Sequence, residues 1–125
     1  MRTGIVIFAH GSRIESANEA VRAVAREVAR AGGFELAGVA FLETYLPGLD
    51  ETVARLADQG AARVLVVPYF LTLGLHLQRD LPRIVEDVAR VHAGVEVRVT
   101  PPLDGHPALA GIVLDRARAA LEEWR

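Results

Sequence analysis

Two histidines stand where a catalytic or ligand-binding group is expected. His10 directly follows the apolar run Ile5–Ala9 in the segment IVIFAHGSR, and His76 lies in the segment LTLGLHLQRD. Imidazole can transfer protons and bind metal ions near neutral pH, but at a strand end it also commonly closes a turn through a hydrogen bond. Both readings stay open for His10. Leucines surround His76 where an exposed loop would be polar, which favours a wall that faces a ligand.

Other polar residues have simpler interpretations beside the chemical one. Glu43 follows an apolar run and is otherwise a solvated carboxylate, and Arg13 and Arg79 are otherwise surface charges. His92, in RVHAG, is expected to interact with the dipole at a helix end. For His106, which precedes a proline at a helix start, capping is favoured over catalysis.

The elements that must position these residues alternate along the chain. Short runs rich in β-branched or aromatic residues predict strands, and stretches with an apolar stripe at helical spacing predict helices. Ser16 and Glu19 indicate a capping box at the start of the first helix, and the pair Gly32–Gly33 indicates its end. The predicted strands are 4–9, 36–42, 63–70 and 95–100, and the later helices are roughly 49–59, 77–90 and 107–124.

Strands that are apolar on both faces and separated by helices predict a parallel sheet covered on both sides. We therefore expect an α/β fold over one domain, residues 1–125: a flavodoxin-like, three-layer sandwich with a four-stranded sheet and helices on both faces. Ligands bind such sheets beyond the carboxyl ends of the strands. If the first strand is central, Glu43, His10 and the segment with His76 converge there.

The composition excludes several classes of protein. The net charge of −2 gives no case for a nucleic-acid partner, and no apolar run is long enough to span a membrane. The chain has no cysteine, which fits a reducing cytoplasm and excludes thiolate chemistry. All fourteen basic residues are arginine, so a P-loop lysine for ATP is missing.

Several segments together resemble one known family. The run HGSR after the first strand, AFLETYLPGLDETVARL, GAARVLVVPYFLTLGLHLQRDLPRI and the later GHP are similar to the short-form sirohydrochlorin chelatases, the CbiX-type cobaltochelatases. The resemblance implies ATP-independent insertion of a divalent metal into sirohydrochlorin, in tetrapyrrole biosynthesis leading to cobalamin or siroheme. Cobalt is expected first, with iron or nickel as alternatives. His10 and His76 are implied to bind the metal and to be catalytic.

The resemblance also implies a substrate site and an assembly. Sirohydrochlorin is a flat apolar disc fringed with carboxylates, so it calls for an apolar wall and a cationic rim. Glu43 is the candidate helper that accepts the pyrrole protons. A homodimer is implied, because long chelatases carry two such domains around one cleft. The substrate-binding residues expected on this basis are Ser12, Arg13, Tyr45, Leu73, Gly74, Leu75 and Arg79.

Three other functions remain as alternatives. A non-catalytic metal or tetrapyrrole carrier would use the same fold and ligands, and only turnover separates it from a chelatase. A histidine phosphatase is disfavoured, because Ala9 stands where those enzymes have an arginine before the nucleophilic histidine. A flavodoxin-like or receiver-like binding module is disfavoured by the lack of a phosphate loop and of an acidic cluster after the first strand.

Overall fold

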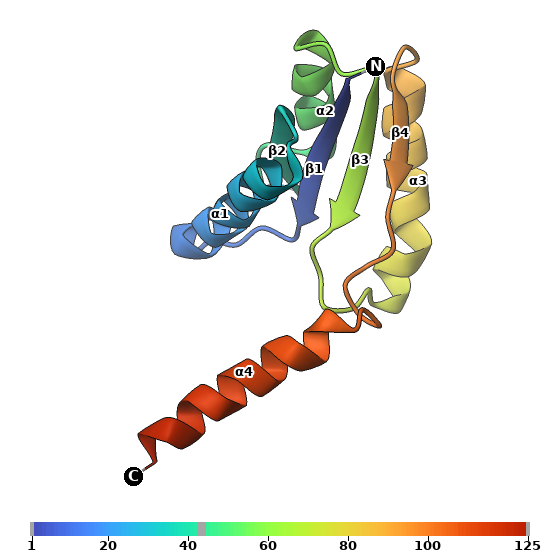
Figure 1. Cartoon of the computed structure of the whole chain (residues 1–125). Helices are drawn as coiled ribbons and strands as arrows, with labels where there is room; N and C mark the ends of the chain where they lie inside the picture. Colours follow the sequence, from blue (N-terminus) through green and yellow to red (C-terminus); the bar gives the residue numbers. More distant parts are fainter. Residues whose placement is uncertain (1, 43–44, 125) are drawn as a thin grey trace.

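The computed structural model describes residues 2–42 and 45–124 (Figure 1). Strands and helices alternate along these residues in the predicted order. The strands are β1 (Thr3–Ala9), β2 (Leu36–Phe41), β3 (Arg63–Pro68) and β4 (Glu96–Val99), and the helices are α1 (Glu15–Gly32), α2 (Leu49–Asp58), α3 (Leu75–Val91) and α4 (Ala108–Glu123).

The four strands form one parallel sheet in the order β2-β1-β3-β4, which confirms that β1 lies between β2 and β3. In the register of the sheet, Ala9 pairs with Phe41 on β2, and Phe8 pairs with Pro68 on β3. The carboxyl ends of these three strands are therefore level. The residue that follows each of them emerges at the same edge of the sheet.

Side chains of β1 alternate between two cores. Val6 and Phe8 are buried on the face that packs against α2 and α3, and Ile5 and Ile7 are buried against α1 on the other face. Full burial of each such side chain contributes about 1.5–3 kcal/mol. A strand buried on both faces explains the uninterrupted apolar run in the sequence. The α/β fold with helices on both faces of the sheet is thus confirmed.

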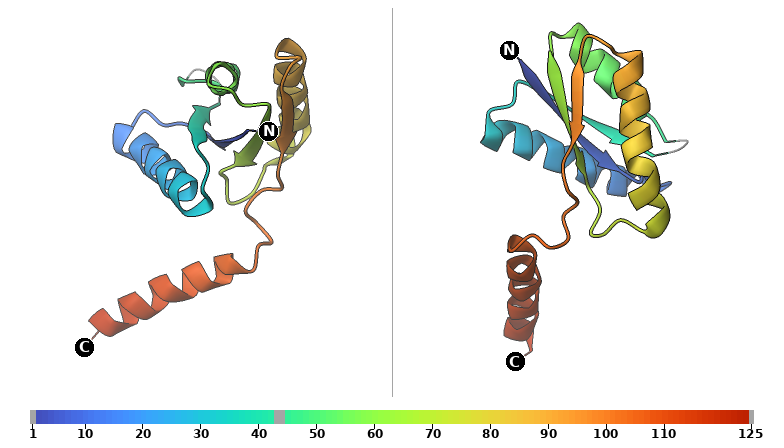
Figure 2. Two further views of the ribbon diagram at one scale, coloured as in Figure 1. Left: turned by 45° about the horizontal axis from the view of Figure 1, so that its top comes forward. Right: turned by 90° about the vertical axis from the view of Figure 1, so that its right-hand side faces the viewer.

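The fourth helix departs from this layered arrangement. In both further views α4 projects beyond the carboxyl end of the sheet instead of lying on a face of it (Figure 2). Its residues are exposed apart from Leu109, which is half-buried, and it has no substantial packing against another described element. Because α4 does not lie on the sheet, the helix layer on the α1 side covers only β1 and β2. None of the helices among the described residues has the length and apolar character needed to cross a membrane.

Two helix starts differ from the sequence prediction. The capping box of Ser16 and Glu19 is wrong: α1 begins at Glu15, after Ile14, without a side-chain cap, and Glu19 pairs instead with arginines on its own helix. Helix α3 begins at Leu75, so His76 lies in a first helical turn and not in a loop. The leucines and polar residues after Gly74 are good helix formers, which extends the helix toward the sheet edge.

Candidate active site at the carboxyl end of the sheet

His10 emerges at the centre of the sheet edge. It is exposed, although the six residues before it on β1 are buried. Its ring packs edge-on against Phe70, with ring centroids 4.8 Å apart and planes inclined at 85°. The N–H of Tyr69 donates to the carbonyl of Phe8 at 2.7 Å, which holds the chain after β3 beside β1 and so brings Phe70 to the histidine. The imidazole is thus positioned by a buried aromatic ring and accessible to a ligand.

Gly11 allows the chain to turn sharply after His10. Its φ of +83° lies in the left-handed region, which glycine adopts without the steric cost that a side chain adds. A Cβ atom at this position would lie 2.8 Å from Cβ and Cγ of Tyr45. Tyr45 is half-buried and packs over this turn, next to the core beneath α1. Both the conformation and the close approach therefore require glycine.

Asn18 fixes the loop between β1 and α1. Its side-chain oxygen accepts from the N–H of Ser12, and its side-chain amide donates to the carbonyl of Ser12, both at 2.8 Å. The Ser12 hydroxyl in turn accepts from the N–H of Ile14 at 3.0 Å. Asn18 is buried, so these bonds satisfy an amide that would otherwise be costly to bury. The sequence interpretation missed this residue.

An open cavity of about 430 Å³ lies beside His10. Its walls come from the end of β1, the first turns of α1 and the chain after β3. Most of its lining is apolar, and the imidazole, Ser12 and Asn18 supply polar groups. None of residues 69–72 was among the site residues expected from the sequence, although the aromatic and leucine side chains of this segment form one wall. The lining residues are Ala9, His10, Gly11, Ser12, Ala17, Asn18, Val21, Tyr69, Phe70, Leu71 and Thr72.

His76 lies in the first turn of α3, beyond segment 69–72, and is exposed. It is not among the described residues that line the cavity. Gly74 begins the helix with an extended backbone, and its carbonyl accepts from the N–H of Gln78 at 2.9 Å. Leu75, which is 79% exposed, lies next to the histidine on the same turn. The two predicted histidines thus follow adjacent strands, β1 and β3. His10 lines the cavity, whereas His76 lies on an exposed helical turn.

The remaining predicted residues are spread around this edge. Arg13 in the β1–α1 loop and Arg79 on α3 are exposed, and neither forms an ion pair within the described ranges. Leu73 is half-buried against the core beneath α2 and α3. Glu43, the predicted proton acceptor, lies outside the described residues. Among the residues that are described, no group of three or more histidine, aspartate or glutamate side chains could hold a metal ion.

The other two histidines have structural partners. Nδ1 of His106 accepts from the N–H of Ala108 at 3.0 Å, so His106 caps the start of α4 as the sequence favoured. His92 ends α3, and its Nε2 lies 2.9 Å from a carboxylate oxygen of Asp50 on α2. The bond between His92 and Asp50 therefore joins two helices, in addition to the expected position at a helix end.

Comparison with known proteins places these features in a family. The family model described as CbiX matches residues 4–120. The sirohydrochlorin cobaltochelatase of Methanopyrus kandleri is 31% identical over 95% of this chain and 97% of its own length. The chloroplastic sirohydrochlorin ferrochelatase of Arabidopsis thaliana is 31% identical over 94% of this chain and 52% of its own.

A solved structure agrees with the fold along nearly the whole chain. The crystal structure of a CbiX protein from Marinobacter aquaeolei VT8 is 32% identical and has a TM-score of 0.84. The match covers 97% of this chain and 98% of that one, so it includes most of α4. Fold, family model and relatives agree, and the chain belongs to the CbiX family.

Proposed function

We propose that this chain inserts a divalent metal ion, cobalt first and otherwise iron or nickel, into sirohydrochlorin. The observation that carries the proposal is His10, an accessible imidazole that lines a largely apolar cavity at the carboxyl edge of the sheet. An apolar wall suits the flat face of a tetrapyrrole, and neutral imidazole nitrogen suits these metal ions. The named relatives, a cobaltochelatase and a ferrochelatase, support the same reaction.

In the proposed mechanism, His10 and His76 hold the incoming metal ion as substrate. Two imidazoles leave coordination positions open, so pyrrole nitrogens can replace water and then the histidines. A metal held by more ligands would be released too slowly to the macrocycle. Insertion also removes two N–H protons from the tetrapyrrole, and we assign their acceptance to an imidazole or to Glu43.

The substrate contacts follow from exposure and charge. Arg13 and Arg79, both exposed, are the proposed partners of the substrate carboxylates, because guanidinium binds carboxylate with two parallel hydrogen bonds. Leu75 gives exposed apolar surface near His76. Tyr45 and Leu73 are half-buried, so we propose that they shape the edge of the apolar wall that contacts the tetrapyrrole. Ser12 and Gly74 complete the proposed set of substrate-binding residues. Ser12 lies in the loop that follows His10, and Gly74 stands at the start of the helix that carries His76.

The setting of the reaction is also part of the proposal. Insertion proceeds without ATP, because a chain without lysine has no P-loop lysine to hold nucleotide phosphates. We place the reaction in the reducing cytoplasm, because a chain without cysteine forms no disulfide bond and therefore needs no oxidising compartment. The active form is a homodimer of one-domain chains, each contributing one side of a cleft.

The test is the absorbance of sirohydrochlorin mixed with purified protein and Co²⁺, Fe²⁺ or Ni²⁺, in buffer without ATP and magnesium. Many turnovers per chain, faster than the metal and tetrapyrrole alone, are expected for at least one ion. Binding that stops at one tetrapyrrole or one metal per chain would identify a carrier instead. A strict requirement for ATP would contradict the proposed mechanism.

A further inference from the structure

Strand β2 forms one edge of the sheet, and no strand among the described residues lies beyond it. Its sequence, LAGVAF, contains no charged residue and no proline. The backbone groups along such an edge can pair with a strand of another chain, and an apolar, uncharged segment favours this pairing. Protection of the β2 edge therefore has to come from another element.

Alternate residues of β2 direct their backbone groups away from β1. The N–H of Leu42, just after the strand, donates to the carbonyl of Ala9 at 3.0 Å, so the even-numbered residues face β1. The N–H of Phe41 donates instead to the carbonyl of Pro47 at 2.9 Å. Because the two sides of a strand alternate along it, the odd-numbered residues of β2 direct N–H and carbonyl groups to the free edge.

Two side chains of α2 occupy the outward carbonyls. The hydroxyl of Thr52 donates to the carbonyl of Val39 at 2.7 Å, and Nη2 of Arg55 donates to the carbonyl of Ala37 at 3.3 Å. Thr52 is buried, whereas Arg55 is exposed and reaches the edge from the outside. A strand that adds to β2 would have to displace the guanidinium before it could pair with Ala37.

Gly38 provides the space for this arginine. A Cβ atom at position 38 would overlap Nη2 of Arg55 and would lie 2.9 Å from Cγ2 of Thr52. The guanidinium therefore lies across the strand at the point where a side chain is missing. Glycine weakens the interior of a strand and often marks the close approach of another group, and Arg55 is that group here.

The charge of Arg55 adds to this protection. Arg55 forms no ion pair within residues 2–42 and 45–124, whereas Arg22 and Arg26 of α1 are both paired with Glu19. A second β2 edge laid alongside would bring two such guanidiniums together, and like charges on paired strands are unfavourable. A cavity of about 290 Å³ along this edge is lined by Arg22, Ala25, Arg26, Ala29, Ala37, Gly38, Val39 and Arg55.

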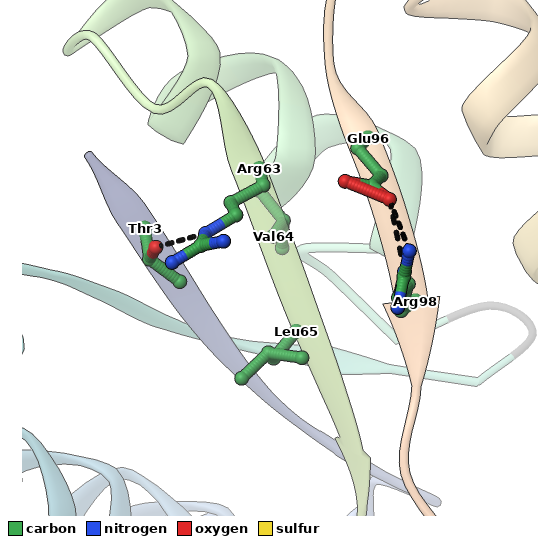
Figure 3. A pocket seen from close by; sticks show the side chains of 6 residues that line it. All are labelled: Thr3, Arg63, Val64, Leu65, Glu96 and Arg98. Atoms are coloured by element: carbon green, nitrogen blue, oxygen red, sulfur yellow. Dashed lines mark hydrogen bonds and ion pairs between the residues drawn. The ribbon is translucent and has the colours of Figure 1, made fainter. Parts of the chain in front are cut away.

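The other edge strand, β4, is protected by its own sequence. It has only four residues, and two of them, Glu96 and Arg98, are charged. Nε of Arg98 donates to the carboxylate of Glu96 at 2.9 Å along the strand (Figure 3). Short length and charged side chains are common protections of an edge strand. β2 is longer and has no charge of its own, so it depends on the side chain from α2.

We propose that Arg55, seated over Gly38, covers the free edge of β2 and prevents the β2 strand of a second copy from adding to the sheet. Without this side chain, the carbonyl of Ala37 is open beside the outward N–H groups of Ala37 and Val39, and two β2 edges can then pair. The proposal concerns association through β2 and does not rest on metal insertion, so either proposal can fail without the other.

Arg55→Met tests the cover, because methionine keeps an apolar side chain but removes the charge and the hydrogen-bond donors. Light scattering over a range of protein concentrations should show a mean particle mass at least about twofold above that of the wild-type protein. Arg90→Met is the matched control: it removes one exposed arginine from α3, which packs on β4, and should leave the particle mass unchanged. Thermal unfolding of both variants verifies that they fold.

Amide hydrogen exchange followed by NMR identifies the surface that associates. In Arg55→Met, exchange at Ala37 and Val39 should slow as the particle mass rises, because their N–H groups become paired. A particle mass equal to that of the wild-type protein at every concentration would overturn the proposal. So would association without slower exchange at these two amides, or equal association of Arg90→Met.

Gly38→Ala tests the same cover with the arginine still present. The added methyl group displaces the guanidinium from the strand, so this variant should associate as Arg55→Met does. Gly94→Ala, where a Cβ atom meets nothing within 4 Å, is its matched control and should behave as the wild-type protein. A folded Gly38→Ala variant with wild-type particle mass would contradict the role of Gly38 in seating Arg55.

Discussion

The two histidine segments differ in how the chain holds them. His10 leaves a buried strand and is held by Phe70, by the Gly11 turn and by the bonds of Asn18 to Ser12. His76 lies on an exposed first turn of α3, whose start has no side-chain cap. The first segment is therefore preorganised before any ligand arrives. The second presents its histidine on an exposed helical turn, where only the flanking Leu73 and Leu77 pack against the core.

Two glycines give the largest expected contrast between these segments. Gly11→Ala should destabilise the fold by about 2–4 kcal/mol, because it adds left-handed strain to a clash with Tyr45. Gly74→Ala adds a methyl group to open space and should cost at most about 1 kcal/mol, as alanine does at a helix start. Urea unfolding measures both. Equal losses would contradict the preorganisation of the first segment.

Asn18 is the next largest contribution. Asn18→Ala removes both bonds to Ser12 and should cost about 1–3 kcal/mol, because buried polar groups of the loop lose their partners. Gln78→Ala, on the exposed first turns of α3, is the matched control and should change the free energy of unfolding by less than about 0.5 kcal/mol. Thermal unfolding compares the two. A neutral Asn18→Ala would mean that other contacts hold the loop.

Phe70 is expected to contribute through its ring. Phe70→Leu keeps an apolar side chain but removes the edge-on contact with His10, and should cost about 0.5–1.5 kcal/mol. Leu71→Ala, at a neighbouring residue that is 71% exposed, should leave stability unchanged and weaken only tetrapyrrole binding. Unfolding and binding titrations of both variants separate these roles. A larger loss of stability in Leu71→Ala than in Phe70→Leu would contradict the structural role of Phe70 and the binding role of Leu71.

The smallest effect is expected on the outer side of α1. The guanidiniums of Arg22 and Arg26 hold the pKa of Glu19 below its usual range. A lowered carboxyl pKa stabilises the fold above the unfolded-state pKa, near 4.3, and this stabilisation is lost as pH falls through the folded-state value. Glu19→Gln should therefore lower the free energy of unfolding slightly at neutral pH and leave it unchanged in strong acid. Salt should remove the difference, because the pair is exposed.

The sequence predicted the layered part of the fold because its signals are local. The apolar runs determine the strands, and β1 is apolar along its whole length because helices cover both of its faces. Gly33 ends α1 with a φ of +70°, as the glycine pair indicated. The parallel order then brings His10 and segment 69–72 to one edge.

Other features depend on contacts that the sequence pattern does not contain. Ser16 and Glu19 have capping-box spacing, but Glu19 binds arginines on its own helix instead. The connection before α4 is joined to the chain after β3 by a hydrogen bond from Thr72 to Asp104, two residues that are distant in sequence. Of these features, only Asn18 could have been found from the local sequence. It is a polar residue on the apolar stripe of α1 that continues through Val21 and Ala25.

We propose that His10 and His76, which lie in unlike segments, act on one metal ion. The rate of insertion into sirohydrochlorin, followed by absorbance for His10→Ala, His76→Ala and the double variant, tests it most directly. Each single variant should lose accelerated insertion while the tetrapyrrole still binds, and the double variant should be no slower than either, because residues that act as a unit are not additive. His92→Ala, which breaks only the bond to Asp50, should keep the wild-type rate. Wild-type rates in His10→Ala, or losses that multiply in the double variant, would contradict a shared metal ion.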